Sequence, residues 1–103
     1  MKTNKIKMYH ATKSSNLVSI LEKGILASPE GIVYLTEKPE DAAKFLAIRM
    51  ETSIISIGIK VDPAKVEEQF DHNEKFFGCR AFGYKGNIKK EDITDFIEYD
   101  LTH

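Results

Sequence analysis

Two short segments near the start of the chain carry side chains that can bind a ligand or move a proton. Tyr9, His10 and Thr12 stand at the end of an apolar–polar alternation that predicts a strand, just before a turn. Tyr34 lies on a second alternating segment. Taken singly, His10 fits a hydrogen-bonded surface or core histidine, and Tyr34 fits a half-buried tyrosine. The ordered pair is more specific than either part, because strand ends are where binding and catalytic groups are commonly placed.

Other reactive residue types do not form a recognisable site. Cys79 has Arg80 beside it but no paired base, which favours a structural thiol over a nucleophile. His72 and His103 are isolated, so no metal site is predicted. A basic cluster lies near the C-terminal end and consists of Arg80, Lys85, Lys89 and Lys90. It is interpreted as a solvated face, and contact with nucleic-acid phosphate is the alternative. The two common glycine-rich phosphate loops do not occur.

Hydrophobic periodicity and turn residues predict the elements that position these side chains. Strands are predicted at residues 5–11, 32–36, 53–61, 80–84 and 94–101. One helix follows the capping side chains of residues 14–16 and ends at Gly24, and a second begins at Pro39. A third, short helix is predicted from Asp62 through Glu68, and residues 69–79 are predicted to be irregular. This order predicts an α+β fold with a split or curved sheet.

The same patterns predict which side chains face the core. The first helix has one apolar stripe, formed by Leu17, Ile20 and Leu21. The second helix has one shared face, formed by Ala42, Phe45, Leu46 and Arg49. The inward residues of the last strand are predicted to be Ile97, Tyr99 and Leu101.

Composition limits the classes of function. The 103 residues fit one domain, and a hydrophobic content of 42% is enough for a packed core. Fifteen Lys and Arg against sixteen Asp and Glu give a net charge of −1, which disfavours a strongly basic nucleic-acid binder. One cysteine excludes an internal disulfide framework. No apolar run approaches the ~20 residues of a membrane span, and the lysine-rich start lacks the apolar stretch of a secretory signal, so a cytoplasmic protein is expected.

The sequence resembles the N-terminal half of the ADP-ribosyltransferase superfamily in four ordered blocks. These are Met8-Tyr9-His10-Ala11-Thr12, residues 16–25 ending in Gly24-Ile25, Val33-Tyr34-Leu35-Thr36, and Ala42-Ala43. The most similar branches are the toxins that ADP-ribosylate thymidine in DNA and the RNA 2′-phosphotransferases. The second branch also has a strand that ends in Val-Asp, as Val61-Asp62 does here. The resemblance implies a small ADP-ribosyltransferase-like α+β fold with a split, curved sheet and two main helices, and NAD as substrate.

The resemblance also implies roles for individual residues. His10, beside Tyr9, would hydrogen-bond the ribose of NAD, and the backbone of Ala11 would contact the nicotinamide carboxamide. Thr12 would support the ribose or the turn, and Tyr34 would stack on the nicotinamide ring. Cleavage of the glycosidic bond builds positive charge on the ribose, so an enzyme must hold the ring, orient the ribose and stabilise that cation.

The late part of the chain departs from the family pattern. A glutamate is expected at the start of a late strand, and the matching positions are Tyr84 and Lys85, which cannot act as a carboxylate. Glu74, in the preceding loop, is the candidate substitute. Ala11 replaces a glycine of the family. Arg49 is either a phosphate-binding residue, as in the phosphotransferase branch, or a solvated helix end, which is the favoured interpretation.

Three hypotheses follow. The first is a nicotinamide-nucleotide-binding enzyme that transfers ADP-ribose to a nucleic-acid or protein acceptor, or hydrolyses NAD. The second is a binding module of the same fold that has lost transfer chemistry and binds NAD, ADP-ribose, a nucleic-acid end or a protein partner. The third is a structural or interaction protein with no small-molecule site.

Overall fold

A single antiparallel sheet organises the described part of the chain. The computed structural model describes residues 5–47, 53–69 and 81–100. The strands are β1 (Ile6–Lys13), β2 (Ile32–Thr36), β3 (Ser53–Val61), β4 (Val66–Gln69), β5 (Ala81–Lys85) and β6 (Ile93–Asp100). The helices are α1 (Leu17–Lys23) and α2 (Pro39–Ala47), with single 3-10 turns η1 (Ser14–Asn16), η2 (Pro63–Lys65) and η3 (Lys90–Asp92). In the residues that the structure describes, the fold is α+β with two helices, which confirms the predicted class.

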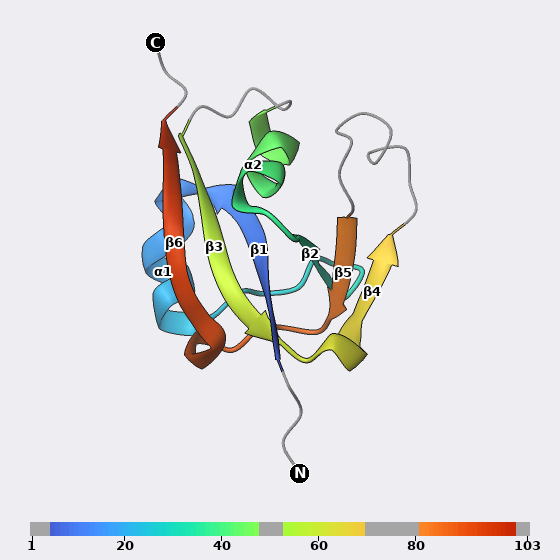
Figure 1. Cartoon of the computed structure of the whole chain (residues 1–103). Coiled ribbons are helices and arrows are strands. Elements are labelled where there is room, and N and C mark those ends of the chain that lie inside the picture. The colour runs from blue at the N-terminus through green and yellow to red at the C-terminus, as the bar shows by residue number, and fades with distance from the viewer. Residues whose placement is uncertain (1–4, 48–52, 70–80, 101–103) are drawn as a thin grey trace.

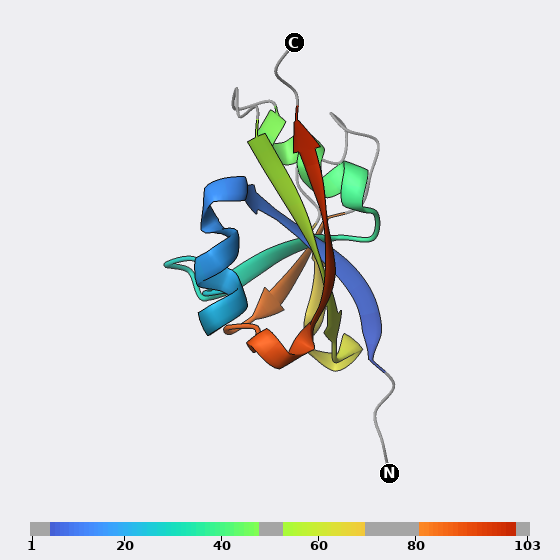
Figure 2. The ribbon, with the colours of Figure 1, turned by 90° about the vertical axis from the view of Figure 1, so that its left-hand side faces the viewer.

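The six strands form two groups of three. Their order across the sheet is β4-β5-β2-β1-β3-β6, and every neighbouring pair is antiparallel. We call β1, β3 and β6 the first half and β2, β5 and β4 the second half. The halves are paired at one position, Tyr9 opposite Thr36, whereas β1 pairs with β3 along its whole length. Figure 2 shows that β1 and β2 cross steeply, so the sheet bends sharply between its halves.

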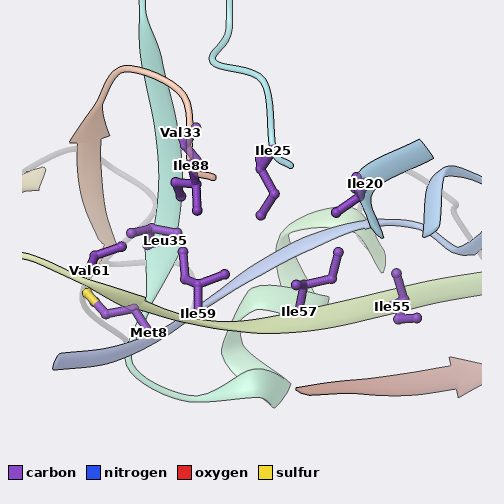
Figure 3. Packing of buried hydrophobic residues seen from close by; sticks show 10 residues of the cluster. All are labelled: Met8, Ile20, Ile25, Val33, Leu35, Ile55, Ile57, Ile59, Val61 and Ile88. Carbon is purple, nitrogen blue, oxygen red and sulfur yellow. The ribbon is translucent and has the colours of Figure 1, made fainter. Parts of the chain in front are cut away.

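The two helices cover opposite faces of the sheet (Figures 1 and 2). The main core lies on the face covered by α1 (Figure 3), and its buried members are Met8, Ile20, Ile25, Val33, Leu35, Ile55, Ile57, Ile59, Val61 and Ile88. On the other face α2 buries Ala42 and Ala43, and Ser56 Oγ donates a hydrogen bond to the Pro39 carbonyl at 2.7 Å. The centre of β3 is therefore buried on both faces.

The connection after α1 ties the two halves together a second time. Ile25 and Ile88 form an isolated bridge, with N–O distances of 2.9 and 2.8 Å, between the segment that precedes β2 and the segment that precedes β6. Gly24 makes this approach feasible, because a Cβ at that position would collide with the Ile88 carbonyl oxygen. Its φ of 84° and ψ of −172° also fall in a region that glycine alone occupies readily.

The predicted third helix is wrong. Asp62 begins a helical turn, since its carboxylate accepts a hydrogen bond from Ala64 N at 2.9 Å. The turn stops at Lys65, and the chain continues as strand β4, which pairs with β5 from Val66 to Gln69. Pairing with a neighbouring strand outweighs the weak local helix preference of this segment, and that pairing is not visible in the sequence.

Two predicted core residues are also wrong. Leu21 is 46% exposed, because α1 is only two turns long and buries Ile20 rather than its whole apolar stripe. Ile97 is 39% exposed, because β6 is an edge strand with a partner on one side only. Leu101 and Arg49 lie outside the described residues.

Candidate functional site

His10 joins the two halves where their backbone pairing stops. His10 is one residue past Tyr9 of the Tyr9–Thr36 pair, and its Nδ1 lies 2.9 Å from the carbonyl oxygen of Tyr34, two residues before Thr36. A carbonyl oxygen only accepts hydrogen bonds, so Nδ1 carries the proton and donates it. In the neutral ring Nε2 is then unprotonated and can accept a hydrogen bond from a ligand hydroxyl.

Burial keeps this imidazole neutral. The surrounding protein lowers the pKa of His10 from its usual 6.5, because the charged ring would lose hydration, and the hydrogen bond to Tyr34 only partly opposes this effect. The ring therefore has the protonation state that leaves Nε2 an acceptor at neutral pH. The same bond gives His10 a structural role, since it satisfies a backbone carbonyl at the junction of the halves.

Tyr34 presents its ring away from the core. Its neighbours Val33 and Leu35 are buried in the main cluster, and strand alternation puts Tyr34 on the opposite face. The side chain is 47% exposed. An exposed phenol ring held on a strand can stack on a planar ligand.

The remaining residues of the first segment divide between the two faces. Alternation along β1 places Tyr9 and Ala11 on one face and His10 and Thr12 on the other. Thr12 Oγ1 accepts a hydrogen bond from Asn16 Nδ2 at 2.9 Å, which supports the turn into α1. The structure brings His10 to the backbone of Tyr34, whereas Tyr9 shares the face of the Tyr34 ring.

The late strand β5 holds two of the predicted site residues, Tyr84 and Lys85. Tyr84 packs against the core, opposite Val33 and Val66. Lys85 is exposed, and its Nζ lies 3.3 Å from a carboxylate oxygen of Glu67. The other two predicted site residues, Glu74 and Arg49, lie outside the described residues.

Sequence reasoning missed Glu67, which the sheet places on the same row as Tyr34. Tyr34 is directly opposite Gly83 on β5, and Gly83 is directly opposite Glu67 on β4. Directly paired residues share a face, so the aromatic ring and the carboxylate flank a residue that has no side chain. The predicted helix over residues 62–68 concealed this placement, and only the pairing of β4 with β5 shows the face on which Glu67 lies.

The first half contains a matching row. Tyr9 is opposite Gly58 on β3, and Gly58 is opposite Asp95 on β6. Here Lys7 Nζ lies 2.9 Å from the Asp95 carboxylate and 5.5 Å from the centre of the Tyr9 ring. Thr94 Oγ1 also donates to Asp95 at 2.9 Å. This arrangement fills the space above Gly58, where a Cβ would meet Asp95 and Lys7.

No family model matches the sequence, and no curated protein matches it either. Among residues 5–47, 53–69 and 81–100, no three side chains gather as a metal-ligating group. Within the same ranges, no helix has the length and apolar character needed to cross a membrane. The geometry of the junction between the halves therefore carries the functional inference.

Proposed function

We propose that the chain is a small ADP-ribosyltransferase-like protein that binds NAD at the junction of the two halves and cleaves its nicotinamide–ribose bond. The products are free nicotinamide and ADP-ribose, which passes to a macromolecular acceptor or to water. The observation that carries this proposal is the 2.9 Å hydrogen bond that joins a neutral, acceptor-ready His10 to the backbone carbonyl of Tyr34, the residue whose ring is exposed.

The geometry supports the roles that the sequence resemblance implies. Nε2 of His10 is the acceptor that a ribose hydroxyl would use, and its orientation is fixed by the bond from Nδ1 to the Tyr34 carbonyl. The exposed Tyr34 ring supplies a flat apolar surface for nicotinamide. The division of the sheet into halves joined at one pair also fits the split sheet expected from the resemblance.

A second candidate is a binding module of the same fold that has lost transfer chemistry. The observation in its favour is strand β5, where Tyr84 packs against the core and Lys85 is a cation. Within the described part of this strand, no side chain is a carboxylate. Such a protein would bind NAD without releasing nicotinamide.

Saturation-transfer NMR with NAD, followed over time, distinguishes these functions. We expect saturation transfer to nicotinamide and adenine protons, and then the appearance of free nicotinamide. Binding should also raise stability by about 2.7 kcal/mol when NAD is present at about a hundred times its Kd. Transfer without release would favour the binding module, and no transfer would exclude both functions for NAD.

Variants locate the site. Tyr34→Ala and His10→Ala should each weaken NAD binding at least tenfold while the thermal midpoint shows that the protein remains folded. Phe96→Ala is the matched control, because Phe96 is also 47% exposed but lies on β6, at the far edge of the sheet. Unchanged affinity in both site variants would refute the assignment of this junction as the NAD site.

A further inference from the structure

We propose that strand β6 is a docking edge for a basic, extended segment of a partner protein, which adds to the sheet as one more strand. Among the described strands, β6 is the last on its side of the sheet and pairs only with β3. About half of the backbone N–H and C=O groups of such an edge strand point away from the sheet. The inference does not rest on the proposed function, because β3 and β1 lie between β6 and β2.

The edge is open along the centre of β6. Residues 94–98 are all exposed. Alternate residues of a strand point to opposite faces, so exposure of every residue in this run means that neither face of the strand is covered there. Figure 2 looks toward this edge, with α1 beside one face of the sheet and α2 beside the other. A partner strand therefore has access to the backbone over the middle of β6.

The two edges of the sheet differ in the features that prevent strand addition. Natural edges are protected by short length, by lysine or proline, or by another segment that covers them. The opposite edge strand, β4, has four residues, whereas β6 has eight and contains no lysine, proline or glycine. Its centre carries two exposed apolar side chains, Phe96 at 47% and Ile97 at 39%. A long edge strand with exposed apolar side chains favours the addition of a strand.

The charge of this edge specifies the chemistry of the partner. Residues 91–100 include five acidic residues and no Lys or Arg, although the whole chain has a net charge of −1. Lysines of the chain hold two of these carboxylates, Asp92 and Asp95. Glu98, at the exposed centre of β6, forms no ion pair within the described residues. A second copy of the chain would bring two acidic edges together, which like-charge repulsion opposes, so a segment rich in Lys or Arg fits better.

Phe96 and Glu98 define the side-chain pattern that the partner needs. They lie opposite Ile57 and Ile55 on β3, whose side chains belong to the core on the α1 face. Phe96 and Glu98 therefore share that face, two residues apart. Directly opposite side chains of paired strands have Cβ atoms about 4.5–5.5 Å apart. An apolar residue of the partner would contact Phe96, and a Lys or Arg two positions away would pair with Glu98.

A peptide probe tests this surface. The probe has nine residues and blocked ends, valine and lysine alternate along one face, and threonine fills the other. In NMR titration of the full chain, we expect shifts concentrated in the amides of β6 and absent from those of β4. Two control peptides should not bind. One has glutamate in place of lysine, and the other is N-methylated at every backbone amide and cannot donate to the strand edge.

Variants with matched controls assign the contacts. Glu98→Lys should weaken binding of the probe about tenfold or more. Glu30→Lys makes the same change of charge in the exposed turn before β2 and should have little effect. Phe96→Ala should also weaken binding, whereas Tyr34→Ala should not, since Tyr34 is equally exposed but lies on β2.

Three outcomes would overturn the proposal. Absence of probe binding would exclude β6 as a docking edge for a basic strand. Equal binding of the N-methylated peptide, or equal weakening by Glu98→Lys and Glu30→Lys, would assign the interaction to general charge attraction. A dimer of the unliganded chain in analytical ultracentrifugation, dissociated by Phe96→Ala, would identify a second copy of the chain as the occupant instead.

Discussion

The two halves of the sheet carry the same pattern of residues and use it differently. In each half, on one face, a tyrosine on the inner strand and a carboxylate on the outer strand flank a glycine on the middle strand. In the first half, Lys7, Asp95 and Thr94 close the space above Gly58 with bonds of 2.9 Å. In the second half, the corresponding contact is 3.3 Å long and strongly exposed.

The two rows differ in the exposure of their ion pairs, which is 38% and 49% for Lys7 and Asp95 but 74% and 67% for Lys85 and Glu67. The closed row lies against β3, which is buried on both faces and paired along its length with β1. Asp95 and Lys7 stabilise each other's charge, so the pKa of Asp95 is lowered and that of Lys7 is raised. The row of Tyr34, Gly83 and Glu67 lies in the half that has shorter strands and a single backbone pair to β1. We infer that rigidity is concentrated in the first half.

Truncation of buried side chains should show the largest difference between the halves in the free energy of unfolding. Ile57→Ala removes a side chain that is fully buried at the centre of β3, and we expect a loss of about 2–5 kcal/mol in the free energy of unfolding. Val66→Ala, in the edge strand β4, removes a side chain that is only half-buried, and it should cost about 1 kcal/mol. Urea denaturation monitored by circular dichroism measures both values.

Hydrogen exchange extends the same comparison. The amides of β3 should exchange only through global unfolding, whereas those of β4 should exchange through local opening of the sheet edge. Similar protection of β3 and β4, together with equal losses in the two variants, would contradict the proposed division of rigidity.

The elements of the first half were predictable from the sequence, because they depend on local patterns. Alternation gave β3 its bounds and Gly24 gave the end of α1, whereas the Asn16 side chain makes no capping hydrogen bond and donates to Thr12 instead. The error at residues 62–68 has a different origin. Asp62 and Pro63 favour a helical turn locally, and only pairing with β5, which is distant in sequence, makes the following residues a strand.

The candidate site was predictable only in part for the same reason. The types and order of His10 and Tyr34 indicated a site, and the structure joins them by one hydrogen bond. The position of Glu67 relative to Tyr34 could not be predicted. Glu67 and Tyr34 share a face because each is paired with Gly83 on the strand between them. A register across three strands is a property of the assembled sheet, and no local pattern encodes it.

The hydrogen bond between the halves should give a smaller, pH-dependent effect. Because the pKa of His10 is lowered in the folded state, the unfolded chain binds a proton that the native chain does not once the pH falls below about 6.5. The free energy of unfolding should therefore fall as the pH is lowered from 7 to 5, by at most about 1.4 kcal/mol per pH unit from this group.

Replacement of the imidazole tests its structural and titrating roles separately. His10→Ala leaves the Tyr34 carbonyl without its partner, and we expect a loss of about 1–3 kcal/mol at pH 7.5. His10→Gln keeps an amide donor and cannot titrate, so its stability should change less across the same pH range. A pH dependence equal to that of the unmodified chain would assign the effect to other groups.

The smallest expected effect compares the two carboxylates directly. Asp95→Asn removes the negative charge that pairs with Lys7 and leaves one acceptor oxygen where there were two, so it should lower the thermal midpoint slightly. Glu67→Gln should lower the midpoint less than Asp95→Asn, since the Lys85–Glu67 contact is 3.3 Å long and both side chains are largely exposed. The depressed pKa of Asp95 means that its contribution is present at neutral pH and is lost as the pH falls through its folded-state value, below 3.8. Differential scanning calorimetry at neutral pH and at pH 3 would resolve the two variants. If Glu67→Gln lowered the thermal midpoint as much as Asp95→Asn, the carboxylates of both rows would contribute equally to stability. That result would contradict the proposed difference between the two halves.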